Sequence, residues 1–260
     1  ERITVCVAPH APYSCSDESL KKAAKMAQKN GLPILIHVLE SKHELDESMK
    51  TFGKTPVQRL YDLGVMDGPA SFAHCVWTSE EDMKLMAKKG TSAIYNPESN
   101  MKLGSGIAQV DMMLKNGVTV GIGTDGSASN NDLNIFHEMD SGAKLQKLIR
   151  GGNSTVGARE ILNMGTLGGA KALGLGKAVG SIEVGKLADI IVLDLNGPEM
   201  QPIYNIPSQL VYASSGRNVE TVICHGRLLM ENSKPLLVDT ARLFEEVRES
   251  AEKITKFLKT

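Results

Sequence analysis

The run Pro33-Ile-Leu-Ile-His-Val-Leu-Glu40 predicts a strand that is apolar on both faces and ends near His37. Residues 43–51, which follow it, have the pattern of a helix. A strand buried on both faces and followed by a helix is typical of a parallel sheet with helices outside it. The same alternation recurs along the chain, with strands predicted at 3–8, 33–38, 70–76, 91–95 and 118–123, and helices at 17–30, 55–63, 79–89, 110–116 and 133–149.

Polar residues lie at the ends of all five predicted strands and are not confined to one point of the sheet. They are His10, His37 with Glu40, His74, Asn96 and Asp125. Chemistry spread over the C-terminal end of every strand is typical of a (β/α)8 barrel, whereas a doubly wound sheet concentrates it at one switch point. No G-x-G-x-x-G or Walker loop follows any strand, which argues against a nucleotide-phosphate cradle. The sequence therefore predicts an α/β chain of the TIM-like barrel type.

The pattern changes after residue 176. Two antiparallel hairpins are predicted, the first pairing 180–185 with 188–195 and the second pairing 219–224 with 227–231. An amphipathic helix is expected at 241–259. We therefore divide the chain into a barrel part at 1–176, β-sandwich strands at 177–200 and 217–240, a segment that packs on the barrel at 201–216, and a C-terminal helix at 241–260.

Composition excludes several kinds of partner. Hydrophobic residues make up 42% and charged residues 23% of the 260, which is an ordinary globular balance. The net charge is -1 and aromatic residues are only 4%, so we expect neither nucleic acid nor a membrane as partner. The four cysteines form no C-x-x-C pair, and three lie in apolar runs. This usage predicts free thiols and a cytoplasmic location.

His37, His74 and Asp125 are the candidates for a metal or catalytic site. Histidines at the ends of consecutive parallel strands lie side by side, and imidazole nitrogens are good metal ligands. A carboxylate buried at a strand tip, such as Asp125, is unfavourable unless it is paired or bound to metal. Glu40, three residues after His37, could carry a proton for a bound water. The alternatives are core histidines bonded to the backbone, a surface Glu40, and Asp125 as a helix N-cap.

His10 and Ser129 are the candidates for substrate contacts. His10 lies between two prolines in a stiff loop, which suits rigid placement, although an exposed turn histidine is the alternative. Ser129 could contact a substrate or simply cap a helix. His43, His137 and His225 are assigned to helix faces and a turn.

Six spaced segments of the chain form a distinctive set. They are Ala8-Pro-His-Ala-Pro-Tyr-Ser-Cys15, Ile36-His-Val-Leu-Glu40, Ala73-His-Cys-Val76, Asn96-Pro-Glu-Ser-Asn-Met-Lys-Leu103, Gly123-Thr-Asp-Gly-Ser-Ala-Ser-Asn-Asn-Asp132 and Gly180-Ser-Ile-Glu-Val-Gly-Lys-Leu-Ala-Asp189. In this order they resemble the amidohydrolase superfamily, and most of all its branch of 5′-methylthioadenosine/S-adenosylhomocysteine deaminases, near the triazine hydrolases. The resemblance covers essentially all 260 residues.

The resemblance implies a metal-dependent hydrolase barrel, of which this chain holds the last five strands, beside a small β-sandwich. It implies hydrolytic deamination of an adenine nucleoside with release of ammonia, and one divalent metal, usually zinc. His37 matches a metal ligand, and Asp125 a second ligand that also takes a proton from the water that the metal activates. Glu40 matches the acid/base that protonates the purine ring, and therefore also contacts the substrate. His74 matches the histidine that orients the nucleophile and stabilises the tetrahedral intermediate.

The same resemblance assigns His10 to a contact near the ribose and Ser129 to a further substrate contact. It implies a small nucleoside or heterocycle as partner and allows a homo-oligomer. Two positions depart from the pattern, because Trp77 and Tyr95 stand where the branch often has histidines.

The largest departure is that no H-x-H pair, which supplies two metal ligands in the family, occurs in the 260 residues. We therefore expect a missing N-terminal barrel segment of roughly 160 residues, within the ~250 of a whole barrel, and expect the 260 residues alone to be inactive. Three hypotheses remain: an adenine-nucleoside aminohydrolase, a hydrolase of another heterocycle such as guanine, cytosine or a triazine, and a truncated inactive chain that needs a partner segment.

Overall fold

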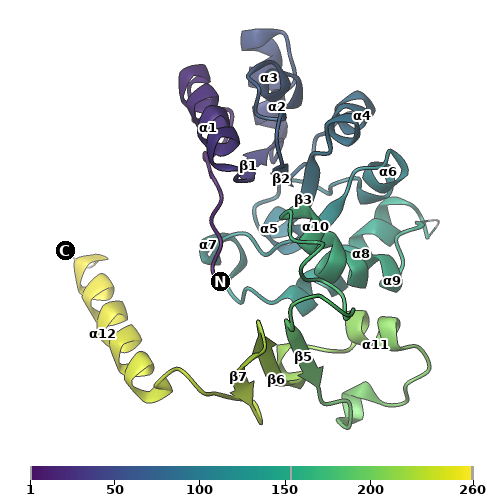
Figure 1. Ribbon diagram of the computed structural model, residues 1–260, viewed down its shortest axis with the longest axis vertical. Helices are drawn as coiled ribbons and strands as arrows, with labels where there is room; N and C mark the ends of the chain where they lie inside the picture. The colour runs from purple at the N-terminus through teal and green to yellow at the C-terminus, as the bar shows by residue number, and fades with distance from the viewer. Residues whose placement is uncertain (1, 153, 259–260) are drawn as a thin grey trace.

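The computed structural model describes residues 2–152 and 154–258, which form a helix-covered parallel sheet and a smaller antiparallel sheet (Figure 1). The parallel sheet has the order β1-β2-β3-β4, and all three pairings are parallel. Helices follow each strand, which confirms the predicted α/β class. The strands are β1 (Ile34–Val38), β2 (Ala70–His74), β3 (Ser92–Tyr95) and β4 (Val120–Ile122).

The prediction of a strand at 3–8 is wrong, so the parallel sheet has four strands where five were predicted. Val7 alone forms a bridge, to Ile34 at the outer edge of β1. Ile3 is 78% and Val5 is 65% exposed. An apolar run becomes a strand only where neighbours pair with its backbone, and residues 3–6 have no strand partner in the described part of the chain.

The helices begin and end largely where local signals place them. α1 (Asp17–Asn30) begins after Ser16, whose hydroxyl accepts from the N–H of Ser19, and it ends at Gly31 with a φ of 63°. Glycine adopts this left-handed conformation without strain, so it ends helices readily. The other helices around the sheet are α2 (Lys42–Phe52), α3 (Pro56–Asp62), α4 (Glu80–Lys89), α5 (Pro97–Lys102), α6 (Val110–Lys115), α7 (Ser127–Asn130), α8 (Ile135–Ile149), α9 (Ala158–Asn163), η1 (Met164–Gly168) and α10 (Gly169–Ala172).

The second sheet is antiparallel and has the order β5-β6-β7-β8, with bounds Ile190–Leu193, Val219–Cys224, Arg227–Glu231 and Lys234–Pro235. The hairpin of β6 and β7 confirms the second predicted hairpin. Its turn residues, His225 and Gly226, have φ values of 51° and 73°, as a tight two-residue turn requires.

The first predicted hairpin is wrong, because residues 180–185 form no strand. β5 pairs with β6 instead, with Ile190 opposite Ile223. Residues 178–187 fold back on themselves, since Leu187 donates to the carbonyl of Ala178. Ile182 is consequently 84% exposed and has no strand beside it.

The remaining elements are η2 (Pro198–Met200), α11 (Ile206–Tyr212), η3 (Gly216–Asn218) and α12 (Thr240–Leu258). α12 confirms the helix predicted at 241–259, of which the last residue lies outside the described ones. It stands away from the body in Figure 1, and none of its described residues is buried.

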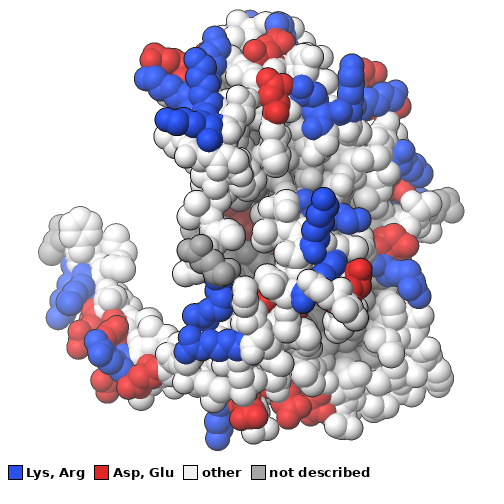
Figure 2. Space-filling view, viewed as in Figure 1, with Lys and Arg blue, Asp and Glu red and all other residues white. Residues whose placement is uncertain are grey.

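The hydrophobic core lies between the parallel sheet and its helices. Phe72 of β2 and Tyr95 of β3 are its largest fully buried side chains. Lysine and arginine are interspersed with aspartate and glutamate over the face shown in Figure 2. Among residues 2–152 and 154–258, no helix has both the length and the apolar character needed to cross a membrane.

Candidate metal and catalytic site

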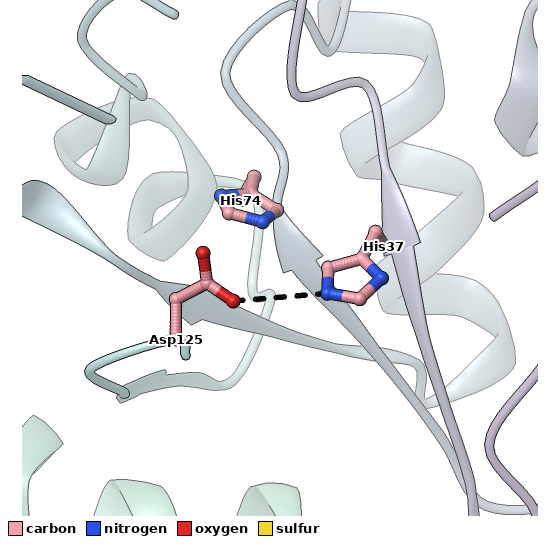
Figure 3. Close-up of side chains that lie close together, drawn as sticks. All are labelled: His37, His74 and Asp125. Atoms are coloured by element: carbon pink, nitrogen blue, oxygen red, sulfur yellow. Dashed lines mark ion pairs between the residues drawn. The ribbon is translucent and has the colours of Figure 1, made fainter. Parts of the chain in front are cut away.

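Three side chains converge at the C-terminal end of the parallel sheet. His37 comes from β1, His74 ends β2, and Asp125 follows β4. Each offers one ligand atom, and these atoms all lie within 4.8 Å of one another (Figure 3). Nε2 of His37 lies 3.8 Å from Oδ1 of Asp125, and the two imidazole rings stack with centroids 5.4 Å apart. The convergence follows from the parallel register, in which Val38 lies opposite His74.

The imidazole of His37 is oriented by the backbone. Its Nδ1 lies 2.7 Å from the carbonyl oxygen of His10. A carbonyl oxygen only accepts hydrogen bonds, so Nδ1 carries the proton and Nε2 keeps a free lone pair. That lone pair is on the nitrogen nearest Asp125, which is the arrangement a metal ligand needs.

Asp125 is held by two serines. Oδ2 accepts from Ser99 at 2.7 Å and from Ser129 at 2.6 Å. Burial opposes ionisation of this carboxyl, but the hydrogen bonds from Ser129 and Ser99 outweigh burial and lower its pKa. Oδ1, on the His37 side, is left for another ligand or proton.

Glu40 faces the other side of His74, with Oε2 3.8 Å from Nε2 of that histidine. Ser105 donates to Oε1 of Glu40 at 3.4 Å. The backbone N–H of Glu40 donates to Oε2 of Glu44 at 3.0 Å, so a buried carboxylate anchors the turn that carries Glu40. Glu40 therefore lies beside the three converging side chains.

His10 and Ser129 both lie next to this cluster. The ring of His10 is 5.1 Å from that of His37, and its Nδ1 is 2.6 Å from the hydroxyl of Ser14. The hydroxyl of Ser129 is engaged with Asp125 and also donates to the carbonyl of Gly126. The structure thus brings all six predicted site residues together and shows Ser129 supporting a carboxylate.

The model of the amidohydrolase family matches residues 1–229 of this sequence. The chain belongs to the amidohydrolase family.

Curated relatives of this amidohydrolase include a 5-methylthioadenosine/S-adenosylhomocysteine deaminase of Caldanaerobacter subterraneus subsp. tengcongensis. The two are 44% identical over 255 residues, which are 98% of this chain and 59% of the relative. A 5′-deoxyadenosine deaminase of Methanosarcina acetivorans is 42% identical over 253 residues, which are 97% of this chain and 58% of the relative.

Solved structures resemble the amidohydrolase fold closely. An adenosine deaminase from Xanthomonas campestris with bound zinc has a TM-score of 0.93 and 36% identity, covering 96% of this chain and 57% of that one. An atrazine chlorohydrolase from Arthrobacter aurescens complexed with zinc has a TM-score of 0.88 and 26% identity, covering 93% and 53%. The chain thus spans little more than half the length of the proteins that it matches.

Backbone strain is concentrated at the strand ends of this amidohydrolase. Leu39, His74, Cys75 and Asp125 have φ values of 55°, 73°, 50° and 60°, in the left-handed region that residues with a Cβ adopt rarely. Leu39 and Cys75 directly follow β1 and β2, His74 ends β2, and Asp125 comes three residues after β4. Such strain persists where surrounding contacts fix it, and it clusters at functional sites.

A cavity of about 760 Å³ is bordered by Glu40. The three converging side chains, His37, His74 and Asp125, do not line it. Its walls come from residues 12–17 and from α2 and α3, and include Tyr13 and Phe52. Small-molecule sites commonly enclose roughly 300–1,000 Å³, so the cavity is large enough for a nucleoside-sized group.

Sequence reasoning missed the residues that hold the site. Ser99, Asn100 and Glu44 are almost fully buried and bond to Asp125, His74 and the Glu40 backbone, respectively. The polar segment after β3 was a signal for the first two, since serine and asparagine rarely lie buried without a partner. A second group, Glu98, Asp132 and His137, also lies close together, but its members are half-buried or exposed and bond to neighbouring side chains.

Proposed function

We propose that the protein containing this chain is a metal-dependent aminohydrolase that deaminates an adenine nucleoside, such as 5′-methylthioadenosine, S-adenosylhomocysteine or 5′-deoxyadenosine. Relatives with 41–45% identity carry the corresponding deaminase names. The observation that carries the proposal is the convergence of His37, His74 and Asp125, with Glu40 3.8 Å from His74.

The donor set fits a divalent metal, with zinc the best candidate. His37 and Asp125 would hold it, because His37 has a bare Nε2 and the carboxyl of Asp125 has a lowered pKa. Imidazole and carboxylate are ordinary zinc ligands, and two structural neighbours were crystallised with zinc. A bound divalent metal lowers the pKa of water toward neutrality and so supplies a nucleophile at ordinary pH.

The side chains divide the proton transfers among themselves. Asp125, ionised at neutral pH, accepts a proton from the attacking water. Glu40 donates a proton to the ring nitrogen next to the carbon under attack, and His74 orients the water and stabilises the tetrahedral intermediate. Asp125 then returns its proton to the amino group, the C6–N bond breaks to release ammonia, and the hydroxyl proton passes to Glu40 as the C6 carbonyl forms. We assign His10 to a contact near the ribose and Ser129 to a further substrate contact, because both lie next to the converging side chains.

The working site also needs a further segment of the barrel. The four described parallel strands form an open sheet, no H-x-H pair occurs in the 260 residues, and the chain spans 59% of the first relative. We infer that this segment supplies the remaining ligands, and we include homo-oligomer formation in the proposal. A cytoplasmic location agrees with four free cysteines.

A second candidate function is hydrolysis of another heterocycle. The structural similarity to an atrazine chlorohydrolase, with a TM-score of 0.88, favours a triazine among the alternatives. The same side chains would serve, because addition of water to an electron-poor ring carbon is common to both reactions.

The test begins with the intact mass and zinc content of the native polypeptide. A mass well above 28.0 kDa with one metal per chain supports the completed barrel. A mass of 28.0 kDa without metal would instead support the truncated, inactive chain. Ammonia release is then measured with the three adenine nucleosides, guanine, cytosine and atrazine.

The decisive variant is Glu40→Gln. We expect it to lose at least about 100-fold in deamination while it retains zinc, because a general acid contributes roughly 10²–10⁴-fold. Glu249→Gln, the same change on the exposed helix α12, should match the wild type. Loss of zinc in Glu40→Gln would mean that Glu40 is a ligand, and preferential turnover of atrazine would favour the second candidate.

A further inference from the structure

One short helix, α5, holds both the backbone and the ring of His74. The backbone N–H of His74 donates to Oδ1 of Asn96 at 3.3 Å, and Nδ1 lies 2.8 Å from Oδ1 of Asn100. Asn96 and Asn100 are four residues apart, so they lie on the same face of the helix. Both are buried, with exposed fractions of 3% and 1%. His74 thus has its strained backbone and its imidazole fixed from the same side.

The side chain of Asn96 does not cap the helix that it precedes. The residue occupies the N-cap position of α5, where an asparagine side chain ordinarily accepts an N–H of the first turn. Here the side chain makes no cap hydrogen bond, and its oxygen accepts from His74 instead. Gly123, just after β4, leaves room for this, since a Cβ built there would lie 3.0 Å from Nδ2 of Asn96.

The side-chain amide of Asn100 is oriented so that its nitrogen lacks a hydrogen-bond partner in the described part of the chain. Its Nδ2 is buried and has no hydrogen-bond partner among the described residues. Buried donors are nearly always satisfied, so an orientation that leaves one unpaired needs a reason. The reason here is the contact of Oδ1 with the imidazole of His74.

This contact fixes the tautomer of His74. An amide oxygen only accepts, so Nδ1 of His74 must carry the proton and, in the neutral ring, Nε2 must be bare. Nε2 lies 3.8 Å from Oε2 of Glu40, and the ring of His74 lies beside His37 and Asp125. A bare Nε2 can accept a hydrogen bond from an incoming water, whereas the other tautomer would present an N–H there.

We propose that Asn100 is a positioning residue, which keeps His74 in the Nδ1–H tautomer with its Nε2 lone pair directed into the site. The value of this tautomer for catalysis rests on the proposed function. The tautomer itself is a property of the folded chain, and it can be measured without substrate or metal.

The test is two-bond ¹H–¹⁵N correlation spectroscopy of the histidine rings in the full 260-residue chain at about pH 8. His74→Gln identifies the His74 signals by their loss. In the wild type we expect Nδ1 to have the shift of a protonated nitrogen and Nε2 that of a bare one. In Asn100→Leu, which removes the acceptor, the two shifts should exchange, because free histidine prefers the Nε2–H form.

Two further variants separate this effect from a general loss of packing. Asn100→Asp keeps an oxygen acceptor and should retain the wild-type pattern. Ser99→Ala lies one residue earlier in α5, is equally buried and bonds to Asp125, so it should also leave the pattern unchanged.

A bare Nδ1 in the wild type overturns the proposal, because the amide of Asn100 would then face His74 with its nitrogen. An unchanged pattern in Asn100→Leu overturns it too. If that variant does not fold, the wild-type spectrum alone still decides whether Nδ1 of His74 carries the proton. A wild-type pattern as expected, combined with no deamination in the activity assay, would refute the proposed function and leave the tautomer assignment standing.

Discussion

Glu44 should make this chain less stable as the pH rises. Its side chain is 4% exposed, and Oε1 has no hydrogen-bond partner among the described residues. Burial raises the pKa of this carboxyl from 4.5 to about 7, against hydrogen bonds from the backbone of Leu39 and Glu40 that lower it. The folded chain therefore keeps a proton that the unfolded chain has already released.

The size of the effect follows from the two pKa values. Each pH unit between 4.5 and about 7 corresponds to about 1.4 kcal/mol, or about 3 kcal/mol in all. Because the folded pKa is the higher one, this stabilisation is fully present below pH 4.5 and is lost as the pH rises through about 7. About 2.5 kcal/mol of it should disappear between pH 5 and pH 8.

The assay is urea unfolding of the wild type and Glu44→Gln at pH 5 and pH 8 with a chelator present. The stability of the wild type relative to the variant should fall by about 2.5 kcal/mol between the two pH values. Any constant penalty of burying the new amide cancels in that difference. Glu47→Gln, three residues along α2 and exposed, is the control. Parallel pH dependence of wild type and Glu44→Gln would refute the reasoning.

Two further predictions concern packing. Phe72→Ala removes a fully buried ring and should lower the free energy of unfolding by about 3–5 kcal/mol. Phe244→Ala, on a ring that is 61% exposed, should change it by less than about 0.5 kcal/mol in the same urea titration, and equal losses would contradict the assigned core. Gly123→Ala places a Cβ 2.8 Å from Cγ2 of Ile94 and 3.0 Å from Nδ2 of Asn96, and should destabilise the chain by about 1–3 kcal/mol in thermal unfolding. Gly126→Ala, with nothing within 4 Å, should not, and a similar loss there would show that the close contact is not the cause.

The residues at the centre of the site could be predicted from sequence because parallel strands end at a common edge. His37, His74 and Asp125 each end or follow an apolar run, so their convergence needs only the pairing order of the strands. The residues that hydrogen-bond to these side chains could not be predicted in the same way. Ser99 and Asn100 act from a helix, and the direction in which that helix presents its side chains depends on tertiary packing.

The two elements that were predicted wrongly have a common cause. Residues 3–8 have the apolar character of a strand, and in residues 180–185 Ile182 and Val184 alternate with polar residues or glycine, which is also a strand pattern. A strand also needs a partner for its backbone, and sequence character does not supply one. Residues 3–6 meet no strand, whereas 178–187 satisfy part of their backbone by folding back on themselves.

The left-handed residues at the strand ends also bear on any attempt to make this protein more heat-resistant. Glycine would adopt the conformation of Leu39 or Cys75 without the roughly 1–2 kcal/mol that a Cβ adds. Both side chains are fully buried, however, and truncating a buried leucine costs about 2–5 kcal/mol. A screen that rewards only survival at high temperature would therefore retain both residues. Because the turn at Leu39 leads into Glu40 and Cys75 follows His74, selection for thermal survival would also preserve the strained backbone beside the site.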